Sequence, residues 1–205
     1  MRTIEKKDIY TAGHSNRVAE LVLMLAQSYH LPEAQIIYLH IASHLHDIGK
    51  IGIPDGILLK TGKLSDCEYR VIQKHSEMGW EIFKDIPNLQ KMAVIIKHHH
   101  ERYDGKGYPD GLQATSIPFG SRLIAVADSL DAMTTTRTYR LSLPFDVALE
   151  EIRNNRNTQF DGEVVDMLES LYKKDKERLK DIFSGGIAVP IKKSTYVPFK
   201  SIATG

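Results

Sequence analysis

The sequence has 205 residues, of which 42% are hydrophobic and 26% are charged. These values are ordinary for a globular domain with a hydrophobic core, and the length is short for two domains. The 27 Lys and Arg residues nearly balance the 26 Asp and Glu residues, so the formal net charge is only +1. Proteins that bind polymeric nucleic acid or anionic membranes usually carry a larger basic excess, so we expect neither DNA, RNA nor a membrane as a partner.

Hydropathy and cysteine content exclude further kinds of segment and site. No apolar stretch approaches the roughly 18 residues of a membrane span, and the N-terminus lacks the apolar centre of a signal peptide. The single cysteine, Cys67, excludes an intrachain disulfide and a thiolate-rich zinc site, and it agrees with a cytoplasmic location. The distinctive feature is nine histidines, six of them in two tight groups.

Helical periodicity dominates the N-terminal part of the chain. Thr11 is the expected N-cap of a first helix. The apolar stripe of that helix comprises Val18, Leu21, Val22 and Leu25. Pro32 is expected in the first turn of the next helix and Gly49 at its C′ position, so that His46 and Asp47 fall in its final turn.

Helical patterns continue through the middle of the chain. Ser65 and Glu68 have the spacing of a capping box, and the helix that they begin is expected to include His75. An apolar run after Pro87 ends in the histidine triplet 98–100. Residues 104–111 read DGKGYPDG, which is too rich in turn-forming residues to be anything but a loop.

The C-terminal part is predicted to hold three more helices. They start near Pro118, at Pro144 and at Asp161, and the last reaches about Phe183. Since no segment shows convincing strand alternation, we predict an all-α fold, a helical bundle with an irregular C-terminal tail. The expected divisions are a lead at 1–10, one domain at 11–183 and an extended tail at 184–205. The tail is expected either to pack on the body or a partner, or to be a plain flexible terminus.

Imidazoles and carboxylates in these helices could form a metal site. Divalent metals that are not held by thiolates take such ligands, and two neighbouring metals need a bridging carboxylate. Because the candidates lie in or at the ends of predicted helices, a bundle could bring them together. They are His14, His46, Asp47, His75, the triplet 98–100 and Asp128. Chemistry alone leaves open which two histidines of the triplet would bind.

Several segments together resemble a known family. Residues 44–55 read HLHDIGKIGIPD and residues 99–109 read HHERYDGKGYP. Further segments are YTAGHSNRV at 10–18, KHSEMG at 74–79, AVADSLDAM at 125–133 and RTYR at 137–140. In order and spacing they resemble the HD-GYP family, a subgroup of the HD metal-dependent phosphohydrolases. The resemblance implies an HD-type helical bundle that hydrolyses cyclic di-GMP, a bacterial second messenger, at a centre of two or three metal ions.

The resemblance also implies the ligands. One ion would be held by His14, His46, Asp47 and Asp128. The other would be held by Asp47, His75, His99 and His100, with Asp47 as the bridge. The choice of His99 and His100 over His98 follows from the family's His-His-Glu order. The implied cofactors are two divalent ions, with iron or manganese foremost and nickel, magnesium, cobalt or zinc also compatible.

The catalytic and substrate-binding roles are carried over in the same way. His46, Asp47 and Lys50 would be catalytic, and Lys50 would also contact the substrate phosphate. The remaining substrate-binding residues implied are Tyr108, Arg137 and Arg140. The two metals would activate a bridging water, and the first product would be the linear dinucleotide, which should accumulate because its further cleavage to mononucleotide is expected to be slow.

The chain departs from the family pattern at two places. Tyr10 stands where members with three metals place a glutamate, which favours two metals here. Asn157 and Gly162 replace the usual Gly and Pro, at a turn that we expect to lie away from the metals.

Several other polar residues are interpreted without a catalytic role. Glu101 and Asp131 are expected to orient ligands, and Asp104 to shape the loop. Four further histidines are interpreted as packing or surface residues: His30, His40, His44 and His98.

Alternative functions stay open from the sequence. The same mechanism could act on cyclic GMP-AMP, or the domain could be a non-catalytic module that binds a cyclic dinucleotide or a cyclase. A third alternative is an HD hydrolase of mononucleotides. An upstream sensory domain, a cyclase partner and a homodimer are all compatible with the sequence.

Overall fold

The computed structural model describes residues 13–135 and 142–183. Within these residues the chain forms helices and loops, and the only strand-like feature is an isolated bridge between Arg156 and Phe160. The all-α prediction is therefore confirmed for the described part of the chain. The lead at 1–10 and the tail at 184–205 lie outside the described residues, as does Thr11.

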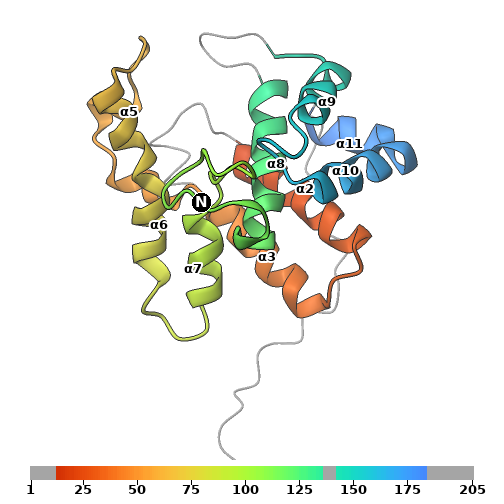
Figure 1. The fold of residues 1–205 in the computed structure, drawn as a ribbon, viewed down its shortest axis with the longest axis horizontal. Helices are drawn as coiled ribbons and strands as arrows, with labels where there is room; N and C mark the ends of the chain where they lie inside the picture. The colour runs from red at the N-terminus through yellow and green to blue at the C-terminus, as the bar shows by residue number, and fades with distance from the viewer. Residues whose placement is uncertain (1–12, 136–141, 184–205) are drawn as a thin grey trace, which may run out of the picture.

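The longer helices follow one another along the chain, with the longest connection within the described residues between α7 and α8 (Figure 1). They are α2 (His14–Ser28), α3 (Glu33–Leu45), α5 (Asp66–Gln73), α6 (His75–Phe83), α7 (Gln90–Lys97), α8 (Phe119–Thr134), α9 (Phe145–Asn154), α10 (Gly162–Lys174) and α11 (Lys176–Phe183). Shorter turns of helix are η2 (Ile48–Gly52), α4 (Asp55–Leu58) and η3 (Ala114–Ser116). None of the described helices is both long and apolar enough to cross a membrane.

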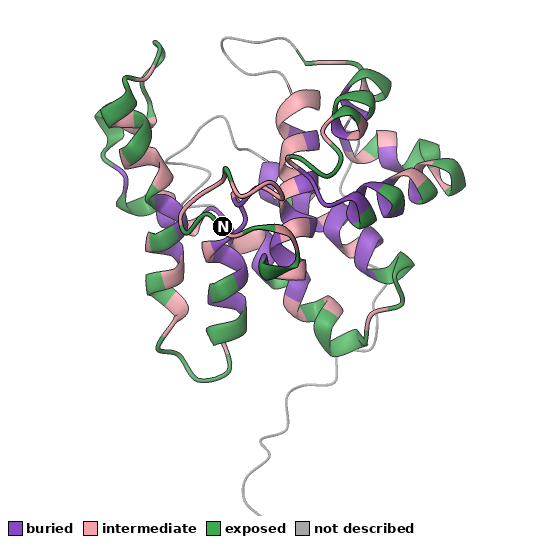
Figure 2. Cartoon of the chain, in the orientation of Figure 1, coloured by how far each residue is buried: buried purple, intermediate pink, exposed green. Residues whose placement is uncertain are grey.

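Helix α2 lies at the centre of the packing. It contacts α3, α8, α10 and α11, while α7 packs on α3, α6 and α8. Figure 1 shows α5, α6 and α7 on one side of α8 and α9, α10 and α11 on the other. Buried residues concentrate toward the middle of the molecule in Figure 2, whereas α5 has no buried residue.

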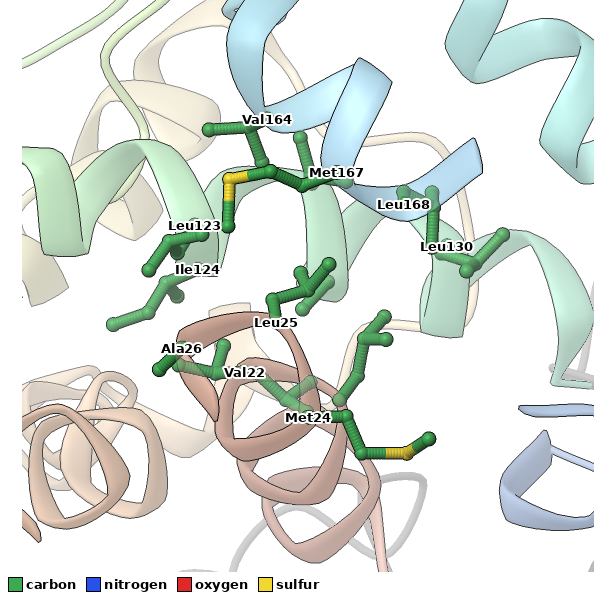
Figure 3. Packing of buried hydrophobic residues seen from close by; sticks show 14 of the residues in the cluster. Val22, Met24, Leu25, Ala26, Leu123, Ile124, Leu130, Val164, Met167 and Leu168 are labelled. Carbon is green, nitrogen blue, oxygen red and sulfur yellow. The ribbon is translucent and has the colours of Figure 1, made fainter. Parts of the chain in front are cut away.

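The hydrophobic core is formed by helices that lie far apart in the sequence. Figure 3 shows side chains of α2, α8 and α10 pointing toward one another. Val22 and Leu25 of α2, Leu123 of α8 and Leu168 of α10 are fully or almost fully buried. Burying a side chain of this size contributes about 1.5–3 kcal/mol, so this contact fixes α2 and α8 relative to each other. Both helices carry candidate ligands.

The predicted caps are partly right. Ser65 and Glu68 form the predicted capping box, and Asp161 accepts a hydrogen bond from the backbone N–H of Glu163 at 2.9 Å. Thr11 lies outside the described residues, and the first described helix begins at His14 with Gly13 at the N-cap position. Gly13 has a φ of 75°, in the left-handed region that favours glycine.

Three predicted helix boundaries are wrong. α3 ends at Leu45, so His46 is its C-cap residue and Asp47 precedes η2. His75 begins its own helix after Lys74 instead of continuing α5. The last predicted helix is two helices, α10 and α11, separated at Asp175.

Gly49 lies inside η2 and is not a helix-terminating residue. A β-carbon at this position would lie 1.9 Å from the carbonyl oxygen of His75 and 2.5 Å from the backbone nitrogen of Gly79. Only glycine permits this close approach of η2 to α6. The contact places the segment that follows His46 and Asp47 directly against the first residue of α6.

Candidate metal centre

Two groups of side chains meet at the end of α3. The first comprises His14, His46 and Asp47, and the second comprises Asp47, His75, His99 and His100. Within each group the nitrogen and oxygen atoms that could bind a metal lie within 4.8 Å of one another. Asp47, which is only 6% exposed, belongs to both groups.

The two carboxylate oxygens of Asp47 face different groups. Its Oδ2 lies 3.6 Å from Nε2 of His14 and 3.5 Å from Nε2 of His46. Its Oδ1 lies 3.4 Å from Nε2 of His75. This arrangement is the one that a carboxylate bridging two metal ions requires.

Asp128 of α8 adds a second carboxylate to the first group. Its Oδ1 lies 3.5 Å from Nε2 of His14, and its side chain is 20% exposed. All the ligands that the family resemblance implies therefore lie around one site, and they come from α2, the end of α3, α6, the end of α7 and α8.

Backbone hydrogen bonds orient three of the imidazoles. In His46, His75 and His99, Nδ1 lies 2.6–2.8 Å from the carbonyl oxygen three residues earlier. Because a carbonyl can only accept, the Nδ1 atom carries the proton and the Nε2 lone pair faces the centre of the site. Each of these histidines stands at a helix end or start, where such carbonyls are available.

The donor set fits divalent metal ions. Nε2 of His14 lies 3.2 Å from Nε2 of His46, and Nε2 of His75 lies 3.3 Å from Nε2 of His99. Two nitrogen lone pairs at this separation repel unless a proton or a cation lies between them. No thiolate takes part, since Cys67 is exposed on α5, so the donors suit metals that accept nitrogen and oxygen ligands.

His14 is held by a buried carboxylate. Its Nδ1 donates to Oδ2 of Asp131 at 2.7 Å, and Arg17 donates to the same carboxylate. Burial alone would lower the pKa of His14, but the hydrogen bonds to Asp131 and Asp47 outweigh it and raise the pKa to about 9. The prediction that Asp131 orients a ligand-type histidine agrees with this contact.

The second group has the opposite electrostatic character. Burial lowers the pKa of His75 and His99, and it lowers the pKa of His100 to about 3. Burial would raise the pKa of Asp47, yet Lys50, whose Nζ lies 2.7 Å from Oδ2, and the neighbouring imidazoles hold it well below its usual value. The second group therefore combines an ionised carboxylate with three neutral imidazoles.

A family model described as an HD domain matches residues 1–164. The chain belongs to the HD domain family. It is 40% identical over 169 residues to the cyclic di-GMP phosphodiesterase response regulator RpfG of Xanthomonas campestris, covering 82% of this chain and 45% of that protein. It is 38% identical over 162 residues to the 3′3′-cGAMP-specific phosphodiesterase 3 of Vibrio cholerae, covering 79% of this chain and 35% of that protein.

A solved structure shares the HD domain fold. Bd1817, an HDG"Y"P protein from Bdellovibrio bacteriovorus, superposes with a TM-score of 0.62 at 21% identity, over 78% of this chain and 51% of that one. The predicted membership of the HD-GYP group is confirmed by these relatives. The chain spans about half the length, or less, of the curated relatives that it matches.

The substrate-side residues of the HD-GYP pattern lie partly within the described chain. Lys50 contacts Asp47, and the ring of Tyr108 lies 4.9 Å from that of His100. Burial raises the pKa of Tyr108, so its phenol stays neutral. Arg137, Arg140 and Tyr10 lie outside the described residues.

Asp110 is a residue that the sequence interpretation missed. Its Oδ2 accepts hydrogen bonds from Nζ of Lys97 at 2.7 Å and from Nε2 of His98 at 2.9 Å. Its backbone N–H donates to Oε1 of Glu101 at 2.8 Å. The described contacts of Glu101 therefore hold the loop that carries Tyr108, and the prediction that Glu101 orients a ligand is not met. Only the position of Asp110 within a turn-rich loop could have indicated such a role.

The turn at residues 157–162 lies nearer to the centre than predicted. Gln159 lines a small cavity together with His99, His100 and Asp128. Arg102 joins the two loops, since it pairs with Asp104 and donates to Oε1 of Gln159 at 2.9 Å. Asp104 also accepts from the backbone N–H of Lys106, which confirms its predicted role in shaping the loop.

Proposed function

We propose that this protein is a metal-dependent phosphodiesterase that opens a cyclic dinucleotide, with cyclic di-GMP as the substrate. The observation that carries the proposal is the position of Asp47 between two groups of imidazoles, with one carboxylate oxygen toward each. The names of the Xanthomonas and Vibrio relatives, both phosphodiesterases, support the reaction class.

The proposed ligands are those implied by the sequence. His14, His46, Asp47 and Asp128 would hold one ion. Asp47, His75, His99 and His100 would hold the other. We propose two ions in total, because Tyr10 offers a neutral phenol where a third ion would need a carboxylate. Iron and manganese are the foremost candidates, and nickel, magnesium, cobalt and zinc share the same preference for nitrogen and oxygen ligands.

Two divalent ions held in this centre would activate a water molecule and polarise the phosphodiester. The chain itself supplies orientation and charge. His46 and Asp47 would hold the ions beside the reacting phosphate, and Lys50 would neutralise charge that develops on the phosphoryl oxygens. Arg137 and Arg140 would grip the phosphate, and Tyr108 would line the substrate pocket. Water adds to phosphorus, the 3′ oxygen leaves with a proton, and the product is the linear dinucleotide with a 5′ phosphate.

Cyclic GMP-AMP is the second candidate substrate. The 38% identity to a 3′3′-cGAMP-specific phosphodiesterase supports it, and no described side chain distinguishes guanine from adenine. A non-catalytic binding module would have no chemical need for a bridging carboxylate flanked by five imidazoles.

A product assay tests the proposal. Purified protein is loaded with manganese or ferrous iron and offered cyclic di-GMP, 3′3′-cyclic GMP-AMP and a bis-aryl phosphate, and the products are separated by chromatography. We expect metal-dependent formation of the linear dinucleotide, which accumulates before any mononucleotide appears. Binding of cyclic dinucleotide without any product would contradict the proposal and favour the binding module.

We also propose a cytoplasmic location, which agrees with the single exposed Cys67 and the absence of disulfides among the described residues. An upstream sensory domain, a cyclase partner and a homodimer stay predictions.

A further inference from the structure

A second arrangement of imidazoles lies outside the candidate metal centre. His40 and His44 stand one turn apart on α3, and neither belongs to the two groups around Asp47. At about 100° per residue, their side chains leave the helix on a different face from that of His46. Both residues are partly exposed, although Nδ1 of His44 is itself buried.

The separation of the two imidazoles matches that of metal ligands. Nε2 of His44 lies 3.2 Å from Nε2 of His40. Zinc binds imidazole nitrogen at about 2.0–2.1 Å, so two nitrogens on one ion with an angle of about 90–109° lie about 2.9–3.4 Å apart. The two imidazole pairs of the candidate centre have the same separations, 3.2 and 3.3 Å.

The pair is oriented by the neighbouring helix. Nδ1 of His40 lies 3.4 Å from the carbonyl oxygen of Ala19 in α2. Because that carbonyl can only accept, Nδ1 of His40 carries the proton and its Nε2 lone pair faces His44. Without a cation, Nε2–H of His44 donates to this lone pair, and the two rings stand nearly perpendicular, at 86°.

We propose that His40 and His44 form a second metal-binding site, here called the α3 clamp, for a single Zn²⁺ or Ni²⁺ ion. Two histidines four residues apart on one helix face can hold zinc in this way, and imidazole suits both metals. The cation takes the place of the proton between the two Nε2 atoms, and that proton moves to Nδ1 of His44, so both ligands stay neutral. Water completes the coordination, because no third ligand-type side chain joins the pair among the described residues.

The α3 clamp changes how a metal count is interpreted. A chain saturated with zinc or nickel would carry three ions, of which only two belong to the candidate centre. Three equivalents would therefore not establish a centre of three metals. The clamp does not depend on the proposed function, since it requires neither substrate nor turnover.

The test compares metal contents of the wild type, His40→Gln and His44→Gln, with His30→Asn as the matched control. His30 is an exposed histidine with a φ of 54°, and asparagine tolerates this left-handed conformation. Each protein is saturated with Ni²⁺ or Zn²⁺, desalted and measured by elemental analysis, with circular dichroism to confirm folding. Each Gln variant should retain one ion fewer per chain than the wild type and the His30→Asn control. Equal contents in all four proteins would overturn the proposal.

A second measurement needs no substitution. In zinc-saturated wild type, a long-range ¹H–¹⁵N spectrum reports which imidazole nitrogens bind metal. We expect Nε2 of both His40 and His44 to report metal coordination and their Nδ1 atoms to be protonated. Retention of a shared hydrogen bond between the two rings in saturated protein would overturn the proposal, whatever the state of the Asp47 centre.

Discussion

The two groups that share Asp47 differ in charge although they hold the same kinds of atoms. The first group adds Asp128 to two histidines, and Asp131 lies behind His14. The second group has three histidines and no carboxylate other than Asp47. Accordingly, the pKa of His14 is raised while those of the second group's histidines are lowered.

Asp47 can therefore bridge two metal positions whose surrounding side chains differ in charge. In the first group a metal ion must displace a proton, and in the second it enters a set of imidazoles that are already neutral. Carboxylates favour harder ions, whereas imidazoles favour borderline ones. The two positions should therefore respond differently to substitution and to pH.

Asp47→Ala should have the largest effect, because it removes the one ligand common to both groups. Both ions should be lost. Losing a residue that only hydrogen-bonds to a metal ligand costs up to about 100-fold in activity, so losing the bridging ligand itself should lower the rate of hydrolysis by more than that. Asp128→Ala should instead cost only the first ion. Elemental analysis and turnover of cyclic di-GMP measure both, and full metal content in Asp47→Ala would show that the bridge is misassigned.

Asp131→Asn should act on the first group alone. Losing this charge behind His14 should weaken metal binding there by about 10- to 100-fold, while the second ion is retained. The matched control is Asp161→Asn, because Asp161 is also buried and pairs with Arg122, at a helix cap. A metal titration monitored by calorimetry distinguishes binding at the first group from binding at the second. Equal loss from both positions, or equal loss in the control, would contradict the assignment.

The pH dependence of the metal-free protein should separate the two groups. His14 should stay protonated up to about pH 9, and His100 should stay neutral down to about pH 3. The raised pKa of His14 stabilises the fold below its unfolded value of about 6.5, and this contribution is lost as the pH rises through about 9. The lowered pKa of His100 has the opposite sign, since it destabilises the fold progressively as the pH falls from about 6.5 toward 3.

Histidine NMR titration of chelator-treated protein follows each imidazole separately. Metal binding at pH 7 should release about one proton from His14 and none from the second group. If His14 and His100 titrated together near pH 6.5, the electrostatic difference between the groups would be refuted.

Much of this centre could be predicted from sequence because its residues lie in or beside helices, where periodicity is strong. The choice of His99 and His100 over His98 could not be made from chemistry, since it depends on tertiary contacts. In the structure both nitrogens of His98 have partners outside the centre, the carbonyl of Val94 and the carboxylate of Asp110.

The helix breaks were harder to predict for a related reason. Lys74 keeps right-handed helical backbone angles, and no Pro or Gly marks the break before His75. Gly49 was interpreted as a terminator because glycine commonly ends helices. Its actual role depends on the close passage of η2 against His75, a contact between segments distant in sequence.

Asp110→Ala should have a smaller effect, on the loop and not on either metal group. Lys97 and His98 would lose their shared acceptor, and the loop that places Tyr108 beside His100 would loosen. A net contribution of about 1 kcal/mol for such a hydrogen bond corresponds to a rise in KM of about 5-fold. Metal content and kcat should change little, and steady-state kinetics separates the two constants. A fall in kcat with unchanged KM would place Asp110 in another role.

The smallest effect concerns the turn at Asn157 and Gly162, where the family pattern has Gly and Pro. Asn157 has a φ of 58°, which glycine adopts more readily. Gly162 is the first residue of α10, a position that favours proline, and Asp161 before it is extended, as proline requires. The obstacle is steric, because a β-carbon on Gly162 would lie 2.4 Å from Oδ1 of Asn157.

The two positions should therefore be coupled in stability. Gly162→Pro alone should lower the free energy of unfolding by about 1 kcal/mol, as expected for overpacking beside a side chain that can partly move away. In the Asn157→Gly background the same substitution should be neutral or should stabilise by about 0.4–1 kcal/mol, because proline restricts the unfolded chain. Urea unfolding of the four proteins gives the coupling energy, which we expect to exceed about 0.5 kcal/mol. Additive effects would mean that Asn157 does not limit the residue at 162, and that the two departures from the family pattern are independent of each other.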